Sequence, residues 1–189
     1  MRARVLAATL LTATALTLAG CGTDTGDTAS TGPAADSNTT ASGTPADTAT
    51  APAAVPAALR FTATTTDGKP FDGATLTGKP TVLWFWAPWC PTCRGQAAET
   101  AKVADQFEGK AHVIGVAGLD EQAAMKDFVT STKISAFPNL SDEPGDIWKK
   151  FEITQQSTYV LLDKDGKTVF TGVLPGGQGL ADKLAELTG

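Results

Sequence analysis

The fold is decided by one stretch of the sequence, Thr81-Val82-Leu83-Trp84-Phe85-Trp86-Ala87-Pro88-Trp89-Cys90-Pro91-Thr92-Cys93. Residues 81–86 form a continuous apolar run, which is typical of a strand buried on both faces. Residues 92–107 then follow a helical pattern, with apolar residues spaced to form an inner face. Cys90 and Cys93 therefore lie where a predicted buried strand meets a predicted helix, and two cysteines so placed can cycle between dithiol and disulfide.

The rest of residues 57–189 alternates between strand-like and helix-like segments. We expect strands at 59–63, 111–116, 158–162 and 167–172, short extended pieces near 71–76 and 138–140, and helices at 121–130, 146–151 and 180–187. Residues 163–166, Asp-Lys-Asp-Gly, form a turn of hairpin type. This order predicts an α/β fold with a central mixed β-sheet flanked by helices on both faces. Sites in such folds tend to lie at the carboxyl edge of the strands.

Cys90 is expected at the start of the helix, where backbone N–H groups are unpaired and the helix dipole favours an anion. A dipole effect of roughly 1 to 2 kcal/mol lowers a thiol pKa by about one unit. Pro91 suits the first helical position, and Cys93 follows one turn later. We therefore predict that Cys90 is the attacking thiolate and Cys93 the resolving thiol. Pro91 and Thr92, which lie between the two sulfurs, would tune the reduction potential of the pair. Trp89 would form part of a substrate shelf, meaning a surface against which the partner lies; the alternative is a residue that only packs against the protein.

The sequence gives less support to other functions of the two cysteines. A structural disulfide across so short a loop stabilises by only about 2 kcal/mol. A zinc site would need more ligands, and His112 is the one histidine of the chain. A thiol peroxidase usually has Thr or Ser three residues before its cysteine and Pro further back, where this chain has Ala87 and Leu83. A Cu(I) metallochaperone stays open as an alternative, because soft thiolates bind Cu(I).

The first twenty residues have the layout of a bacterial lipoprotein signal peptide. Arg2 and Arg4 precede an apolar region, and Leu-Ala-Gly at 18–20 leads to Cys21, which resembles a lipobox. We expect cleavage before Cys21 and lipid attachment to it; the alternative is an ordinary secretory signal with a spare cysteine nearby. More than one acyl chain is needed for stable anchoring.

Three parts of the chain are thus predicted. Residues 1–20 are the signal peptide, residues 21–56 are the lipidated cysteine and a disordered Ala/Thr/Pro-rich tether, and residues 57–189 are one folded domain. The protein would lie on the extracytoplasmic face of the bacterial cell membrane, held there by its lipid. The formal net charge of −5 without a Lys/Arg cluster disfavours nucleic acid as a partner.

The sequence resembles exported thioredoxin-like thiol–disulfide oxidoreductases of the TlpA/ResA/DsbE branch. The matching motifs are Gly78-Lys79-Pro80, the Trp89-to-Arg94 segment, residues 114–151 and the hairpin at 163–166. Within this branch, the sequence is similar to secreted DsbE-like and DsbF-like proteins of high-GC Gram-positive bacteria. The resemblance implies a thioredoxin-like fold with an N-terminal β-hairpin extension and a βα insertion.

The same resemblance implies thiol–disulfide exchange with exported cysteine-containing proteins, through the redox-active disulfide and without another cofactor. A membrane thiol–disulfide partner would reset the dithiol. Some members of the branch serve cytochrome c maturation, so an accessory role there is an alternative. Whether the protein works as oxidase, reductase or isomerase is left open by the sequence.

The chain departs from the family pattern near the dithiol. The usual cis-proline position falls on Ser157, so this loop is either reshaped or strained, and Gln156 and Ser157 become candidate substrate-binding residues beside the dithiol. A plain polar strand entry is the alternative. Trp86 is a further candidate of this kind, or a core residue. Cytoplasmic thioredoxins carry an acid where this chain has Trp84, so Asp120 or Glu121 becomes the candidate proton acceptor for the resolving thiol; a solvated helix start is the alternative.

Overall fold

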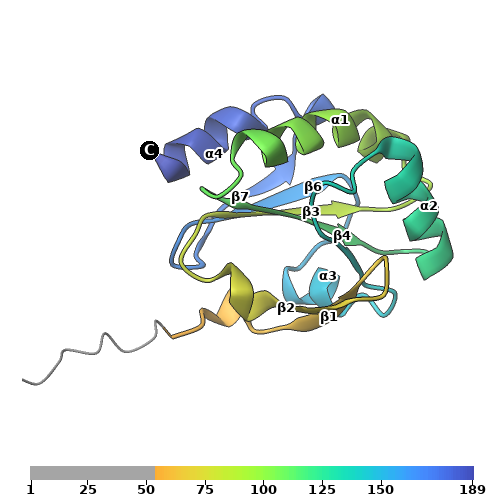
Figure 1. Ribbon diagram of the computed structural model, residues 1–189, viewed down its shortest axis with the longest axis horizontal. Helices are drawn as coiled ribbons and strands as arrows, with labels where there is room; N and C mark the ends of the chain where they lie inside the picture. The colour runs from red at the N-terminus through yellow and green to blue at the C-terminus, as the bar shows by residue number, and fades with distance from the viewer. Residues whose placement is uncertain (1–53) are drawn as a thin grey trace, which may run out of the picture. The chain divides into compact units, whose positions relative to one another are not determined.

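A computed structural model describes residues 54–189 of the chain (Figure 1). These residues contain a seven-stranded sheet in the order β2-β1-β5-β4-β3-β6-β7. The strands are β1 (Thr62–Thr65), β2 (Pro70–Asp72), β3 (Thr81–Trp86), β4 (His112–Ala117), β5 (Asn139–Ser141), β6 (Thr158–Leu162) and β7 (Thr168–Val173). The α-helices are α1 (Pro91–Gln106), α2 (Gln122–Thr132), α3 (Asp146–Lys150) and α4 (Leu180–Thr188). Single 3-10 turns cover Ala57–Leu59 (η1), Gly73–Leu76 (η2) and Pro175–Gly177 (η3).

Strand β3 lies inside the sheet, between β4, which is parallel to it, and β6, which is antiparallel. The predicted mixed sheet is therefore confirmed. The register pairs Phe85, near the end of β3, with Thr158, the first residue of β6. An antiparallel neighbour starts where its partner ends, so the segment entering β6 lies at the same sheet edge as the segment leaving β3.

The two faces of β3 feed two hydrophobic cores. Val82, Trp84 and Trp86 belong to the core that α1, α2 and α4 cover, while Leu83 and Phe85 belong to the core beneath α3. Figure 1 shows α1 and α4 on one side of the sheet and α3 on the other. All six residues of β3 are buried, which is why residues 82–86 are all apolar instead of alternating with polar ones.

The N-terminal edge of the domain differs from the prediction. The strand expected at 59–63 begins only at Thr62, because η1 precedes it: the Leu59 N–H donates to the Pro56 carbonyl at 3.0 Å, and Leu59 enters the core beneath α3. Val55 packs partly against that same core. Contacts of the domain therefore begin two residues before the predicted boundary at 57.

The predicted signal peptide, the lipidated Cys21 and residues 22–53 of the predicted tether lie outside the described residues. Within residues 54–189, none of the helices is both long enough and apolar enough to span a bilayer.

Candidate active site

Cys90 and Cys93 are joined by a disulfide at the start of α1. The chain leaves β3, turns so that the Cys90 N–H donates to the Ala87 carbonyl at 3.1 Å, and begins the helix at Pro91. Cys90 is the N-cap residue, and its sulfur accepts the Cys93 N–H at 3.0 Å. This backbone donor and the helix N-terminus both favour negative charge on the Cys90 sulfur over a neutral thiol.

The two cysteines differ in access. Cys90 is 2% exposed and Cys93 is fully buried, whereas Pro91 and Thr92 between them are exposed. A partner protein can therefore reach Cys90 more readily than Cys93, which fits the predicted roles of attacking and resolving sulfur.

Trp89 lies on the surface next to Cys90, with 54% of its area exposed. Its indole N–H donates to the Leu119 carbonyl at 3.2 Å, and Leu119 is itself 55% exposed, at a backbone φ of +62°. A large apolar side chain at positive φ is uncommon. The two side chains give the rim of the site an apolar character, in the place where the sequence predicted a substrate shelf.

Ser157 is the polar side chain that the fold brings onto the disulfide. Its hydroxyl oxygen lies 3.2 Å from the Cys90 sulfur and 3.2 Å from the Cys93 sulfur, and the residue is 4% exposed. Its φ is +69°, in the left-handed region. A proline is locked near φ −65°, so proline does not fit this backbone. The loop is therefore reshaped relative to the family pattern, and Gln156 lies half-buried beside it.

Gln96 is a site residue that the sequence reasoning missed. It is fully buried on α1, where its amide N–H₂ donates to the Ser157 carbonyl at 3.0 Å and to the Leu174 carbonyl at 2.9 Å. Its amide oxygen accepts the Trp84 indole N–H at 2.8 Å. A signal for it existed, because Gln96 stands three residues after Cys93 and next to Ala97, on the helix face predicted to be apolar. A polar residue there needs buried partners.

A second buried pair extends this polar layer. The Thr100 hydroxyl lies 2.7 Å from the Tyr159 hydroxyl and donates to the Gln96 carbonyl. Burial raises the pKa of Tyr159 far above its ordinary value, the Thr100 hydrogen bond opposes that rise, and nearby Glu99 adds to it. Tyr159 is therefore neutral at physiological pH, like the amide, indole and hydroxyl groups around it.

Two of the predicted site assignments need correction or qualification. Trp86 is fully buried, stacks on Phe128 with ring centroids 4.4 Å apart and donates to the Asn139 side chain, so its position is that of a core residue and not of a substrate-binding one. The Asp120 carboxylate accepts the N–H of its neighbour Glu121 at 2.8 Å. Within the described residues, neither acid is hydrogen-bonded to a cysteine sulfur, so the structure does not bring the candidate proton acceptors onto Cys93.

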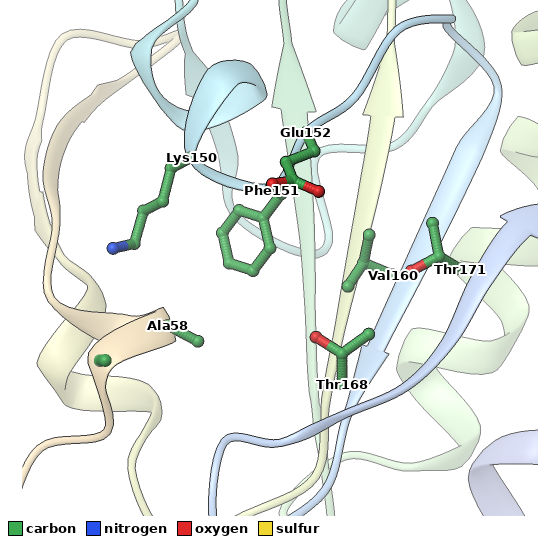
Figure 2. A pocket seen from close by; sticks show the side chains of 8 residues that line it. Ala58, Lys150, Phe151, Glu152, Val160, Thr168 and Thr171 are labelled. Carbon is green, nitrogen blue, oxygen red and sulfur yellow. The ribbon is translucent and has the colours of Figure 1, made fainter.

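A separate pocket of about 500 Å³ lies away from the disulfide, on the face of the sheet that carries α3. Figure 2 shows Phe151, Val160 and Thr168 around it, contributed by the segment after α3, by β6 and by β7. Lys150 and Glu152 also line the pocket, together with Ala58 from η1. None of the described residues that line it is a cysteine.

Comparison with known proteins places this geometry in a family context. A model of the AhpC/TSA family matches residues 55–170. The soluble secreted antigen MPT53 of Mycobacterium tuberculosis is 43% identical over 112 residues, which is 59% of this chain and 64% of MPT53. The chain thus spans less than two thirds of that relative's length.

Two solved structures are similar over more of the domain. MTB DsbF, in mixed oxidised and reduced forms, has a TM-score of 0.66 and 42% identity, covering 71% of this chain and 99% of that one. A secreted Mycobacterium tuberculosis disulfide oxidoreductase homologous to Escherichia coli DsbE has a TM-score of 0.63 and 37% identity, covering 69% and 98%. These likenesses confirm the predicted thioredoxin-like fold.

Proposed function

Because this chain belongs to the AhpC/TSA family and carries a disulfide at the N-terminus of α1, we propose that it is a thiol–disulfide oxidoreductase acting on exported, cysteine-containing proteins. One observation carries the proposal: the sulfur of Cys90 caps α1, accepts a backbone N–H and is the more accessible of the pair. The names of its relatives support it, since one of the similar structures is described as a disulfide oxidoreductase.

The reaction needs two sulfur displacements. In the reduced protein, the Cys90 thiolate attacks one sulfur of a partner's disulfide, and the other partner sulfur leaves as a thiolate. Cys93 then loses its proton and attacks the Cys90 sulfur, which restores the Cys90–Cys93 disulfide and frees the second partner sulfur. Two electrons pass to the partner, whose two thiolates take up protons. The reverse sequence oxidises a partner dithiol, and the two cysteines serve as the redox group without a further cofactor.

The surroundings of Cys90 do not favour peroxide as the substrate. A hydroxyl three residues before the cysteine is the usual arrangement of a thiol peroxidase, and this position holds Ala87, which is fully buried and apolar. Leu83, in the place of the expected proline, is also fully buried. Disulfide exchange is therefore the better assignment within the family.

The decisive test is the equilibrium of the Cys90–Cys93 pair in full-length protein against glutathione buffers of graded composition. Exchange between the pair and a disulfide-bonded polypeptide is expected, and a Cys90→Ser variant serves as the inactive control. No interconversion of the wild-type pair with small thiols would refute the proposal. A potential near −120 mV, like DsbA, would point to an oxidase, and one near −270 mV, like thioredoxin, to a reductase.

The same reduced protein tests the metallochaperone alternative. Titration with Cu(I) in competition with a chelator measures affinity and stoichiometry. Because soft thiolates bind Cu(I), tight and stoichiometric binding of one Cu(I) per chain would favour the metallochaperone instead.

The place of action is proposed from the N-terminal sequence and from the word "secreted" in the names of two relatives. We propose that Cys21 carries lipid, that the chain is held at the extracytoplasmic face of the membrane, and that a membrane thiol–disulfide partner resets the dithiol. A Cys21→Ala variant is expected to move from the membrane fraction to the culture medium of its bacterial host. Retention of the variant in the membrane, equal to the wild type, would contradict the lipid anchor.

A further inference from the structure

The hydroxyl of Ser157 is equidistant from the two reacting sulfurs, at 3.2 Å from each. We propose that Ser157 is a catalytic residue: it donates its hydrogen bond to the Cys90 thiolate in the reduced protein and accepts one from the Cys93 thiol. This inference rests on the proposed disulfide exchange and assigns a role within it. A hydroxyl has one O–H donor and two acceptor lone pairs, so one Ser157 side chain can hold both bonds at once.

The other hydrogen-bond donors and charged groups near the dithiol are compatible with this role for Ser157. The Cys93 N–H also points at the Cys90 sulfur, at 3.0 Å, so the thiolate would have a backbone donor and a side-chain donor. The neighbouring acids, Asp120 and Glu121 before α2, do not bond to a sulfur within the described residues. The charged side chains nearest the dithiol along α1 have other partners: Arg94 lies over the Phe128 ring at 5.0 Å, and half-buried Glu99 pairs with exposed Lys102. Tyr159, on β6, is neutral.

The fold holds this hydroxyl in place at a conformational cost. Ser157 has φ +69°, which costs a non-glycine residue some stability, and such outliers persist only where their surroundings fix them. Gln96 supplies the fixing contact, since its amide donates to the Ser157 carbonyl at 3.0 Å while its other bonds tie it to β3 and to the segment before η3. Because β3 and β6 pair antiparallel, Ser157, which directly precedes β6, lies beside the end of β3, from which the chain continues to Cys90.

The exchange step balances with Ser157 in this role. While Cys90 is a thiolate, the serine O–H stabilises its charge. When Cys90 bonds to the partner's sulfur, that charge leaves with the departing thiolate, and the Cys93 proton is released to the solvent or to that thiolate. The Cys93 thiolate formed in this way is 3.2 Å from the same hydroxyl and can take over its hydrogen bond before attacking Cys90. Ser157 itself is neither oxidised nor reduced.

The test compares reduced full-length wild type with Ser157→Ala and Ser157→Gly. Both variants lack the hydroxyl, but glycine tolerates positive φ, so it relieves the backbone strain that alanine keeps. The rate of Cys90 alkylation by iodoacetamide, followed by mass spectrometry across pH, gives the pKa of the thiol. We expect the midpoint to rise by about one unit in both variants, since a hydrogen bond to a charged acceptor is worth at least that much. Thr154→Ala, on the exposed part of the same loop, is the control and should not shift.

Equilibration with glutathione gives a second measure. Loss of the bond to the thiolate should disfavour the reduced state about tenfold, which lowers the reduction potential by about 30 mV for two electrons. An unchanged midpoint in both variants, or a shift confined to one of them, overturns the assignment. Alkylation requires no protein partner, so the two proposals fail separately: a wild type that exchanges disulfides with unshifted variants refutes only the role of Ser157. Shifted variants of a protein that does not exchange disulfides refute only the proposed function.

Discussion

Replacement of Gln96 by glutamate would put a carboxyl group where the structure demands an amide. The side chain is fully buried, and its N–H₂ group serves two carbonyls, of Ser157 at 3.0 Å and Leu174 at 2.9 Å. A neutral carboxyl has one O–H and can serve only one of them. An ionised carboxyl would place negative charge against both oxygens, with the Trp84 N–H as its remaining donor. We therefore expect the introduced carboxyl to stay protonated well above the ordinary glutamate pKa.

The structure sets the size of the effect. At about pH 4, where the introduced carboxyl is mostly protonated even in the unfolded chain, one unserved carbonyl should cost about 1 to 3 kcal/mol. Above the unfolded-state pKa of about 4.3, the unfolded chain releases the proton while the folded chain keeps it, so stability falls as the pH rises. The loss is about 1.4 kcal/mol per pH unit, or about 5 kcal/mol more by about pH 8 if the folded pKa lies at least that high.

Guanidinium denaturation of the oxidised protein across this pH range measures the difference between Gln96→Glu and wild type. Gln96→Met, which has a similar length and no titrating group, is the matched control, and its difference from wild type should stay constant with pH. If the Gln96→Glu difference were the same at about pH 4 as at about pH 8, the hydrogen-bond arrangement deduced for Gln96 would be wrong.

Three further outcomes are expected from the same structure. Reduced Cys93→Ser protein should accumulate a mixed disulfide with a disulfide-bonded polypeptide, visible on non-reducing gels, whereas Cys90→Ser should not. Trp89→Ala should change the free energy of unfolding by less than about 0.5 kcal/mol, because the side chain is 54% exposed, while slowing exchange with polypeptides more than with glutathione. Burial, aided by Lys79, lowers the pKa of His112, so stability should fall as the pH drops from about 6.5 through the folded pKa, and His112→Asn should flatten that part of the denaturation profile.

The elements near the dithiol were predictable because each leaves a local signature. The run at 81–86 is apolar on both faces, and in the structure each face does enter a core. The hairpin turn at 163–166 joins β6 and β7 as expected, with the Gly166 N–H donating to the Asp163 carbonyl. Helix α1 begins at Pro91, because proline suits the first helical position, and Cys90 is therefore the N-cap residue. The prediction failed at 59–63, where the buried Leu59 belongs to a 3-10 turn that closes onto Pro56 and not to a strand.

The polar layer under the dithiol was less predictable, because its members are distant in sequence. Ser157 is 67 residues from Cys90, and Gln96 is 78 residues from Leu174. Positional comparison with the resembled family identified Ser157 as a departure from proline but could not give its φ. That angle occurs together with the hydrogen bond from Gln96, which no local pattern encodes.

The polar side chains under the dithiol are all neutral, and this determines what surrounds the negative charge that forms on a sulfur. Cytoplasmic thioredoxins carry an acid where Trp84 stands; here the indole N–H of Trp84 donates to the Gln96 side chain, whose amide donates to the Ser157 carbonyl. Indole, amide and hydroxyl groups do not titrate near neutral pH, so the charge that appears on a sulfur during exchange meets fixed dipoles and not a second ionisable group. The Ser157 hydroxyl contacts both sulfurs while its backbone is in the left-handed region. We therefore expect Gln96 and Ser157 to act as one unit, because the Gln96 amide holds the strained backbone that places the Ser157 hydroxyl at the reacting sulfurs.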